Sequence, residues 1–176
     1  MYFKKIIGRK CYLSPVDEND FQKYAQWLNE PELSIYLETY NEIVTAESEK
    51  NRFNNIKDRH EYSIIQSDNN ELIGNCSLFR IDHINQTAET GIFIGRKDIW
   101  NKGYGTEALS LLLDYGFKAL NLHNISLQVY ENNVRAIKIY EKIGFKKIGI
   151  KREALYRNMK RHNIIYMDIL ADENNG

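Results

Sequence analysis

The residues best suited to chemistry lie in one stretch near the middle of the chain, Trp100-Asn-Lys-Gly-Tyr-Gly-Thr-Glu-Ala108. An apolar, strand-like run precedes it and a run with helical apolar spacing follows it, so it joins a strand to the start of a helix. A helix N-terminus offers unpaired backbone N–H groups and a positive dipole. Gly103 and Gly105 carry no Cβ, so the backbone there can approach a ligand closely. These features suit a pyrophosphate; a glycine-rich turn that only caps the helix fits equally well.

Two phosphate-binding patterns fit this loop poorly. A Walker loop requires Gly, four residues and then Gly-Lys-Ser/Thr, a spacing that the chain lacks. Gly103 to Ala108 matches the letters of the G-x-G-x-x-A dinucleotide fingerprint. That fingerprint closes the first strand of a parallel βαβ unit and is followed about 20 residues later by a ribose-binding acid. Here three antiparallel-type strands come first, and Asn121 to Tyr130 contains no acid.

Length and composition indicate one globular domain. The chain has 176 residues, of which 43% are hydrophobic and 27% charged, and no apolar run is long enough to span a membrane. The basic N-terminus is too short for a signal peptide. Cys11 and Cys76 fit neither a zinc site nor a disulfide framework, and both are expected to be buried. We therefore expect a cytoplasmic protein with a single domain over residues 1–176, a core of about 8–170 and a polar tail at 171–176.

The net charge is zero, so the total suggests neither a nucleic-acid nor a membrane partner. The charges are nevertheless unevenly distributed. Nine acids and one base lie between Asp17 and Glu49, whereas nine bases and two acids lie between Lys138 and Arg161. Such runs are usually solvated faces, but an anionic cofactor and a cationic substrate could also use the split.

The first third of the chain is expected to form a strand at 10–14 and then three helices. The first helix has apolar residues at i, i+3, i+4 and i+7: Phe21, Tyr24, Ala25 and Leu28. Asp17 is its expected N-cap, Pro31 is the expected start of the second helix, and Thr45 is the expected N-cap of the third. The third helix has a thin apolar face, Phe53 and Ile56.

The rest of the chain alternates between strands and helices. Strands at 61–66, 71–81 and 87–95, with a bulge at Gly74, should form an antiparallel meander because short turns join them. After the glycine loop, apolar residues mark a helix: Leu109, Leu112, Leu113, Gly116 and Leu120. This helix is followed by a strand at 124–130 and by a helix that Asn132 or Asn133 caps and Gly144 ends. After it come a strand from Phe145, a turn within 155–161 and a strand at 163–170. This order predicts an α/β (α+β mixed) fold with a helical crossover at the centre of the sheet.

The glycine loop resembles the acetyl-CoA loop of the GNAT superfamily of N-acetyltransferases, Q/R-x-x-G-x-G/A followed by a helix. The order of elements matches as well, and Asn132 to Phe145 is similar to the family's later signature of Asn, Tyr and Gly-Phe. Segments at 27–33, 152–154 and 166–170 are similar to the ribosomal-protein N-acetyltransferase (RimJ/RimL-like) branch. The resemblance runs from about Tyr12 to Leu170. It implies the GNAT fold, a mixed, mostly antiparallel central sheet of about seven strands with helices on both faces.

The resemblance implies an acetyl-CoA-dependent N-acetyltransferase without a metal. The pantetheine arm would lie along the backbone of Ile92, Phe93 and Ile94. The pyrophosphate would be held by the loop, Trp100, Asn101, Lys102, Gly103, Tyr104, Gly105 and Thr106. Asn133 would touch the pantetheine or order the crossover. Arg135 and Lys138 would either meet the adenosine 3′-phosphate or be solvated surface. Trp100 stands where the family usually has Gln or Arg, which removes one polar side-chain contact but leaves the backbone contacts.

The resemblance also implies direct attack of an amine on the acetyl thioester. Tyr140 aligns with the tyrosine that many members place beside the sulfur; its phenol would protonate the thiolate, although a packed core aromatic is the alternative. Some members carry a glutamate twelve residues ahead of that tyrosine, where this chain has Gln128. Glu89 is then the best remaining base, with a structural acid as its alternative.

The acceptor amine stays open at this stage. The RimJ/RimL resemblance suggests a protein N-terminus. A polyamine is the main small-molecule alternative, because the acidic N-terminal half would suit a cation. The wider branch also includes enzymes that act on antibiotics, amino acids and sugars. A module that binds acyl-CoA without transferring anything is the alternative of a different class. A homodimer is also among the expectations.

Overall fold

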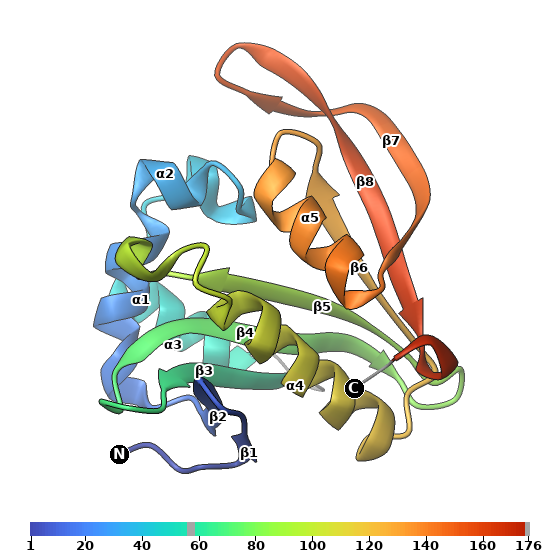
Figure 1. Cartoon of the computed structure of the whole chain (residues 1–176). Coiled ribbons are helices and arrows are strands. Elements are labelled where there is room, and N and C mark those ends of the chain that lie inside the picture. Colours follow the sequence, from blue (N-terminus) through green and yellow to red (C-terminus); the bar gives the residue numbers. More distant parts are fainter. Residues whose placement is uncertain (56–58, 175–176) are drawn as a thin grey trace.

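The computed structural model describes residues 1–55 and 59–174 (Figure 1). The strands are β1 (Ile6–Ile7), β2 (Cys11–Pro15), β3 (His60–Gln66), β4 (Leu72–Asp82), β5 (Thr87–Ile94), β6 (Asn124–Tyr130), β7 (Lys146–Arg157) and β8 (Lys160–Leu170). The α-helices are α1 (Phe21–Leu28), α2 (Pro31–Ser34), α3 (Ala46–Asn55), α4 (Tyr104–Lys118) and α5 (Val134–Ile143). Four 3-10 turns are η1 (Glu18–Asp20), η2 (Glu38–Asn41), η3 (Lys97–Ile99) and η4 (Ala171–Glu173).

The eight strands of residues 1–55 and 59–174 form one sheet in the order β1-β2-β3-β4-β5-β6-β8-β7. Neighbouring strands are antiparallel except for β5 and β6, which run parallel because α4 crosses between them. The predicted mixed, mostly antiparallel sheet is confirmed. The sheet exceeds the predicted seven strands because the two residues of β1 pair with β2.

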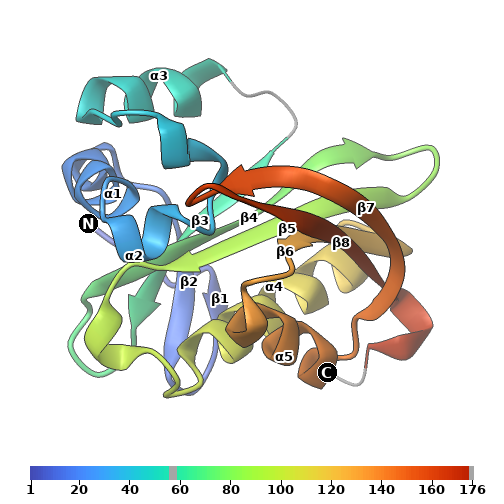
Figure 2. The same ribbon diagram turned by 90° about the horizontal axis from the view of Figure 1, so that it is seen from above.

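Helices cover both faces of this sheet (Figure 2). On one face, α4 and α5 bury a core that includes Leu109, Leu112, Ile125, Leu127 and Tyr140. On the other face, α1, α2 and the segment before α3 bury a second core, built from Tyr12, Phe21, Tyr24, Trp27, Leu33, Val44 and Phe93. Strand alternation therefore sends successive side chains of β5 and β6 to two different environments.

The predicted caps are present in part. Asp17, predicted as the N-cap of α1, instead accepts a hydrogen bond from Asn19 N and caps η1. The N-cap residue of α1 itself is Asp20, which makes no side-chain cap hydrogen bond. Thr45 Oγ1 accepts a hydrogen bond from Ser48 N at 3.0 Å at the start of α3. The bulge predicted at Gly74 is present, since Ile64 pairs with Gly74 while Ile65 pairs with Leu72. Ile56, expected on the apolar face of α3, lies outside the described residues.

The C-terminal hairpin is longer than predicted. β7 continues to Arg157 and β8 already begins at Lys160, so the turn shrinks to Asn158 and Met159, both with positive φ (48° and 59°). The turn lies within the predicted range of 155–161, but its two residues could not be picked out because such a turn normally carries glycine. The polar tail is also anchored, because Asn174 Nδ2 donates to Asp114 Oδ1 at 2.6 Å. Residues 175–176 of the expected tail lie outside the described part.

Candidate functional site

The centre of the sheet contains an opening between β5 and β6. The two strands pair only at Thr87–Glu89 and Asn124–Ser126, yet β5 continues to Ile94 and β6 to Tyr130. Figure 1 shows them diverging beyond that point. Within residues 1–55 and 59–174, no strand pairs with β5 from Thr90 to Ile94 on the β6 side. The free backbone edge of Ile92, Phe93 and Ile94 can therefore receive an extended ligand as an added strand.

The glycine loop lies just after the C-terminal end of β5. Gly103, at φ +88°, is the N-cap residue of α4 and, having no side chain, supplies no side-chain cap. The first amides of α4, at Tyr104, Gly105 and Thr106, lack i−4 acceptors within the helix. A Cβ at Gly105 would meet, among the described atoms outside its own helix turn, only Ile94 Cγ1 at 3.6 Å. Packing within the protein therefore does not require a glycine at this helical position, whereas an anionic ligand at the amides does.

Trp100 and Arg135 form a stack at the wide end of the opening. Trp100 Nε1 donates to Ile94 O at 2.8 Å, which ties the loop to the end of β5. The guanidinium carbon of Arg135 lies 3.7 Å from the centre of the indole ring. Burial lowers the pKa of Arg135. Arg135 is therefore held beside the loop, so the solvated-surface alternative fits it less well than it fits the exposed Lys138.

A pocket of about 600 Å³ occupies this wide end. It is lined by Trp100 from the loop, by Tyr36 beyond α2, and by Asn133 and Arg135 at the start of α5. Asn133 Oδ1 accepts a hydrogen bond from Ala136 N at 3.2 Å, so Asn133 is the helix cap and orders the crossover, one of its two predicted roles. The pocket therefore places Trp100, from the loop predicted to hold the pyrophosphate, beside Asn133 and Arg135 at the start of α5.

The loop also has a cation that the sequence analysis missed. Lys10, just before β2, donates from Nζ to Lys102 O at 2.7 Å. Glu107 Oε1 accepts from Lys10 N at 2.7 Å and so fixes the start of α4 to the start of β2. The ammonium and the helix N-terminus therefore lie together. No sequence pattern indicated this contact, because Lys10 is 92 residues from Lys102 in the sequence.

Tyr140 lies on the α4–α5 face of the opening. It is 9% exposed and belongs to the core beneath α4 and α5, and its ring centre is 5.7 Å from that of Phe145. Burial raises the pKa of Tyr140 to about 12. The phenol is therefore neutral at pH 7 and a weaker acid than a free tyrosine. Within the described residues its hydroxyl has no hydrogen-bond partner, so it is available to a ligand.

Glu89 lies on the opposite face. It has the same strand parity as Phe93, which packs beneath α1, whereas Ala88 faces the core beneath α4. Glu89 Oε1 accepts from Arg80 Nη1 at 2.8 Å, and the two side chains are 26% and 67% exposed. This carboxylate lies where β5 and β6 separate and points away from Tyr140. Gln128, two residues beyond the partner Ser126, shares its face and is exposed.

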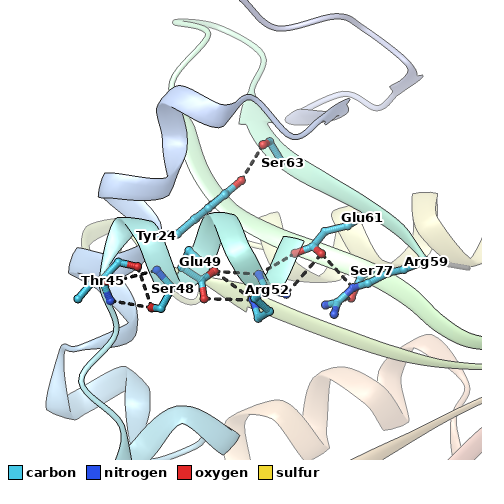
Figure 3. Close-up of polar contacts among 9 residues, drawn as sticks. All are labelled: Tyr24, Thr45, Ser48, Glu49, Arg52, Arg59, Glu61, Ser63 and Ser77. Carbon is cyan, nitrogen blue, oxygen red and sulfur yellow. Dashed lines mark hydrogen bonds and ion pairs between the residues drawn. The ribbon is translucent and has the colours of Figure 1, made fainter. Parts of the chain in front are cut away.

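A buried network of charges supports the face that carries Glu89 (Figure 3). Arg52 of α3 pairs with Glu49 at 2.8 Å and with Glu61 of β3 at 3.2 Å. Arg59 pairs with Glu61 at 2.9 Å and donates to Ser77 of β4 at 3.0 Å. The Glu49 and Glu61 side chains are only 3% and 4% exposed. Because each is matched by arginine, these acids hold α3 on the sheet and do not attract a ligand.

The matching family model connects this geometry with known proteins. It describes the acetyltransferase (GNAT) domain and matches residues 10–146, more than half of the chain. This chain belongs to the GNAT acetyltransferase family. In the part of the chain that the structure describes, no helix is long and apolar enough to cross a membrane, and no cluster of three metal-ligating side chains is found.

Individual relatives cover most of the chain. A spermidine N(1)-acetyltransferase of Escherichia coli (strain K12) is 31% identical over 163 residues, 92% of this chain and 86% of that protein. A crystal structure of the spermidine N-acetyltransferase from Vibrio cholerae in complex with CoA and spermine shows a TM-score of 0.82 at 26% identity, covering 93% of this chain and 97% of that one. The putative ribosomal N-acetyltransferase YdaF of Bacillus subtilis (strain 168) is 33% identical over 102 residues, 58% of this chain and 55% of that protein.

These findings make the chain an acetyl-CoA-dependent N-acetyltransferase, as the glycine loop and the later Asn, Tyr and Gly-Phe signature predict. The residues fit this co-substrate, since β5 has a free backbone edge and Gly105 leaves room at the amides of α4. The likeness to a putative ribosomal N-acetyltransferase, YdaF, extends over 58% of the chain.

Proposed function

We propose that the protein transfers the acetyl group of acetyl-CoA to the primary amine of a small molecule, by direct attack in a ternary complex. The observation that carries this proposal is the opening between β5 and β6, with Glu89 on one face and Tyr140 on the other. An amine can approach from the face of Glu89 while the sulfur departs toward Tyr140. This arrangement separates the site that removes a proton from the site that supplies one.

The small size of the acceptor is supported by the cavities. Besides the pocket at the wide end, a pocket of about 690 Å³ lies between η2, the end of β6 and the tip of the β7–β8 hairpin. The volume of this second pocket is typical of small-molecule sites. The spermidine acetyltransferases among the relatives make a polyamine the first small amine to test. A protein N-terminus is the second candidate, and the partial match with YdaF favours it.

Direct attack is supported by the state of the two cysteines. Both are fully buried. Burial raises the pKa of Cys11 to about 12 and raises that of Cys76 well above its ordinary value. Neither forms the thiolate that an acetyl-enzyme on cysteine requires.

The proposed chemistry assigns one task to each face. Acetyl-CoA supplies the acetyl group as a thioester. Glu89 accepts a proton from the substrate ammonium, directly or through water, because an alkyl amine is largely protonated at pH 7. Tyr140 donates a hydrogen bond, and then its proton, to the sulfur as negative charge develops there. Trp100 to Thr106 and Arg135 orient the co-substrate through its phosphates.

A panel of amines tests this proposal. Thiol release from acetyl-CoA is measured with spermidine, cadaverine, lysine and a peptide with a free N-terminus, and the products are weighed by mass spectrometry. We expect one acetyl group on a small amine for each thiol released. Acetylation of the peptide alone favours the second candidate. Binding of acetyl-CoA without acetylation of any amine contradicts the proposed activity and supports a binding module.

A further inference from the structure

A buried cation lines the pocket at the end of β6. Arg157, near the tip of the β7–β8 hairpin, is only 8% exposed and forms part of the wall of this 690 Å³ pocket. Tyr130 from β6 and Tyr40 from η2 line the same pocket. Exposed arginines need no explanation, but a guanidinium removed from water normally has a carboxylate partner.

The contacts of Arg157 leave part of its guanidinium unsatisfied. Its Nη1 donates to Tyr156 O at 3.0 Å. Its guanidinium carbon lies 4.5 Å from the ring centre of Tyr40 and 5.8 Å from that of Tyr130. Its Nε, however, is buried without a hydrogen-bond partner, and none of the carboxylates described in the structure forms an ion pair with it. The faces of the two aromatic rings hold the planar group in place, and the Tyr130 hydroxyl also bonds to it, but these contacts leave Nε without an acceptor.

This pocket shares a face with the proposed base. Glu89 pairs with Ser126 across the parallel strands, and Tyr130 lies four residues farther along β6, with its side chain on the same face. Four residues of strand span about 13 Å. A ligand that binds Arg157 and reaches Glu89 must therefore be extended and must run along β6 past Gln128.

We infer that the acceptor is a small amino carboxylate, with its carboxylate on Arg157 and its reacting amine at the other end, near Glu89. This inference rests on the proposed function and names its substrate class. A guanidinium recognises a carboxylate through charge-assisted N–H donors, and the buried Nε of Arg157 is such a donor without a partner. Glu38, exposed at the same pocket, suits a second ammonium beside that carboxylate, as in a diamino acid.

A polyamine fits this pocket less well, since all of its charges are positive. An ammonium inserted beside Arg157 would repel the guanidinium and leave Nε without an acceptor. The acidic residues of the first third of the chain attract the ammonium groups of polyamines and of amino carboxylates alike, so they do not distinguish these two substrate classes. The carboxylate, which only the amino carboxylate carries, distinguishes them.

L-lysine and cadaverine form a matched pair of acceptors, because they differ by a single carboxylate. Their binding is measured by calorimetry with the protein saturated in CoA, which cannot transfer an acetyl group, and kcat/KM is measured with acetyl-CoA. For the wild type we expect lysine to bind at least tenfold more tightly than cadaverine and to show at least tenfold higher kcat/KM.

Arg157→Met should erase this preference by weakening lysine and not cadaverine, and Arg157→Lys should restore part of it. Arg152→Met, an exposed arginine on the same hairpin, should leave it unchanged. Equal binding of the two ligands to the wild type, or a lysine preference that survives in Arg157→Met, overturns the inference. Tight, Arg157-dependent binding of lysine without acetylation upholds the pocket and contradicts the transferase proposal instead.

Discussion

The two faces of the opening between β5 and β6 are built in different ways. Most groups expected to hold the co-substrate come from residues 92–106 and are mainly backbone: a free strand edge, the helix amides and a glycine without a Cβ. The groups expected to select the acceptor are side chains from β5, η2 and the C-terminal hairpin, namely Glu89, Glu38 and Arg157. A backbone site tolerates substitution at many positions, whereas a side-chain site can change its ligand with one residue. This contrast predicts different consequences for mutations on the two faces.

The largest effect is expected at Tyr140, because its hydroxyl is proposed to protonate the departing thiolate. Tyr140→Phe retains the packing against Phe145 and removes the hydroxyl. We expect kcat to fall by about 10²–10⁴-fold with CoA affinity nearly unchanged. Steady-state kinetics and calorimetry on the folded variant measure the two quantities. A kcat within a few-fold of the wild type would assign Tyr140 to packing alone.

Glu89→Gln should give the next largest effect and should act on the acceptor face only. We expect kcat to fall by about 10²-fold, the lower end of general-base contributions. In the plot of kcat against pH, the part in which kcat rises with pH should change, while the affinity for CoA stays constant. The measurement is a pH profile of kcat for both proteins. Wild-type kcat across pH would mean that solvent deprotonates the amine and that Glu89 only pairs with Arg80.

Gly105 tests the backbone face by separating stability from binding. Gly105→Ala should stabilise the fold by about 0.5–1 kcal/mol, since alanine favours the helix and its Cβ meets only Ile94 at 3.6 Å. The same change should weaken CoA binding, and Gly105→Val should weaken it more than tenfold, or about 1.4 kcal/mol. Thermal unfolding and calorimetry give both values. Gly149→Val, at a glycine with no described atom within 4 Å, is the control; if Gly105→Val binds CoA as tightly as this control does, the loop is not part of the site.

Glu38→Gln should give the smallest effect. Because Glu38 is exposed at the acceptor pocket, we expect a few-fold rise in acceptor KM, larger at low salt, with kcat unchanged. Glu30→Gln is a useful comparison, because Glu30, unlike Glu38, already pairs with Lys97 at 2.8 Å. Initial rates at two ionic strengths measure the difference. A fall in kcat at Glu38→Gln would place this acid closer to the chemistry than the structure indicates.

The same contrast explains what the sequence could predict. The order of strands and helices, the caps at Thr45 and Asn133 and the glycine loop are local features with clear residue signals, and they are present. The turn of the C-terminal hairpin was predicted within 155–161, but its two residues, Asn158 and Met159, were not identified because they lack the usual glycine. Lys10 beside the loop and Arg157 in its pocket were missed, because each meets its partners across long stretches of sequence. A site whose side chains come from distant segments has no characteristic residue spacing, so it cannot be predicted from the sequence alone.

Amide hydrogen exchange with and without CoA measures whether the co-substrate binds the free edge of β5 and the start of α4. We expect slower exchange at Gly91–Ile94 and Tyr104–Thr106 when CoA is bound, and unchanged exchange in η2 and at residues 154–159. Unchanged exchange along β5 at saturating CoA, or protection that appears mainly at 154–159, would contradict this mode of binding.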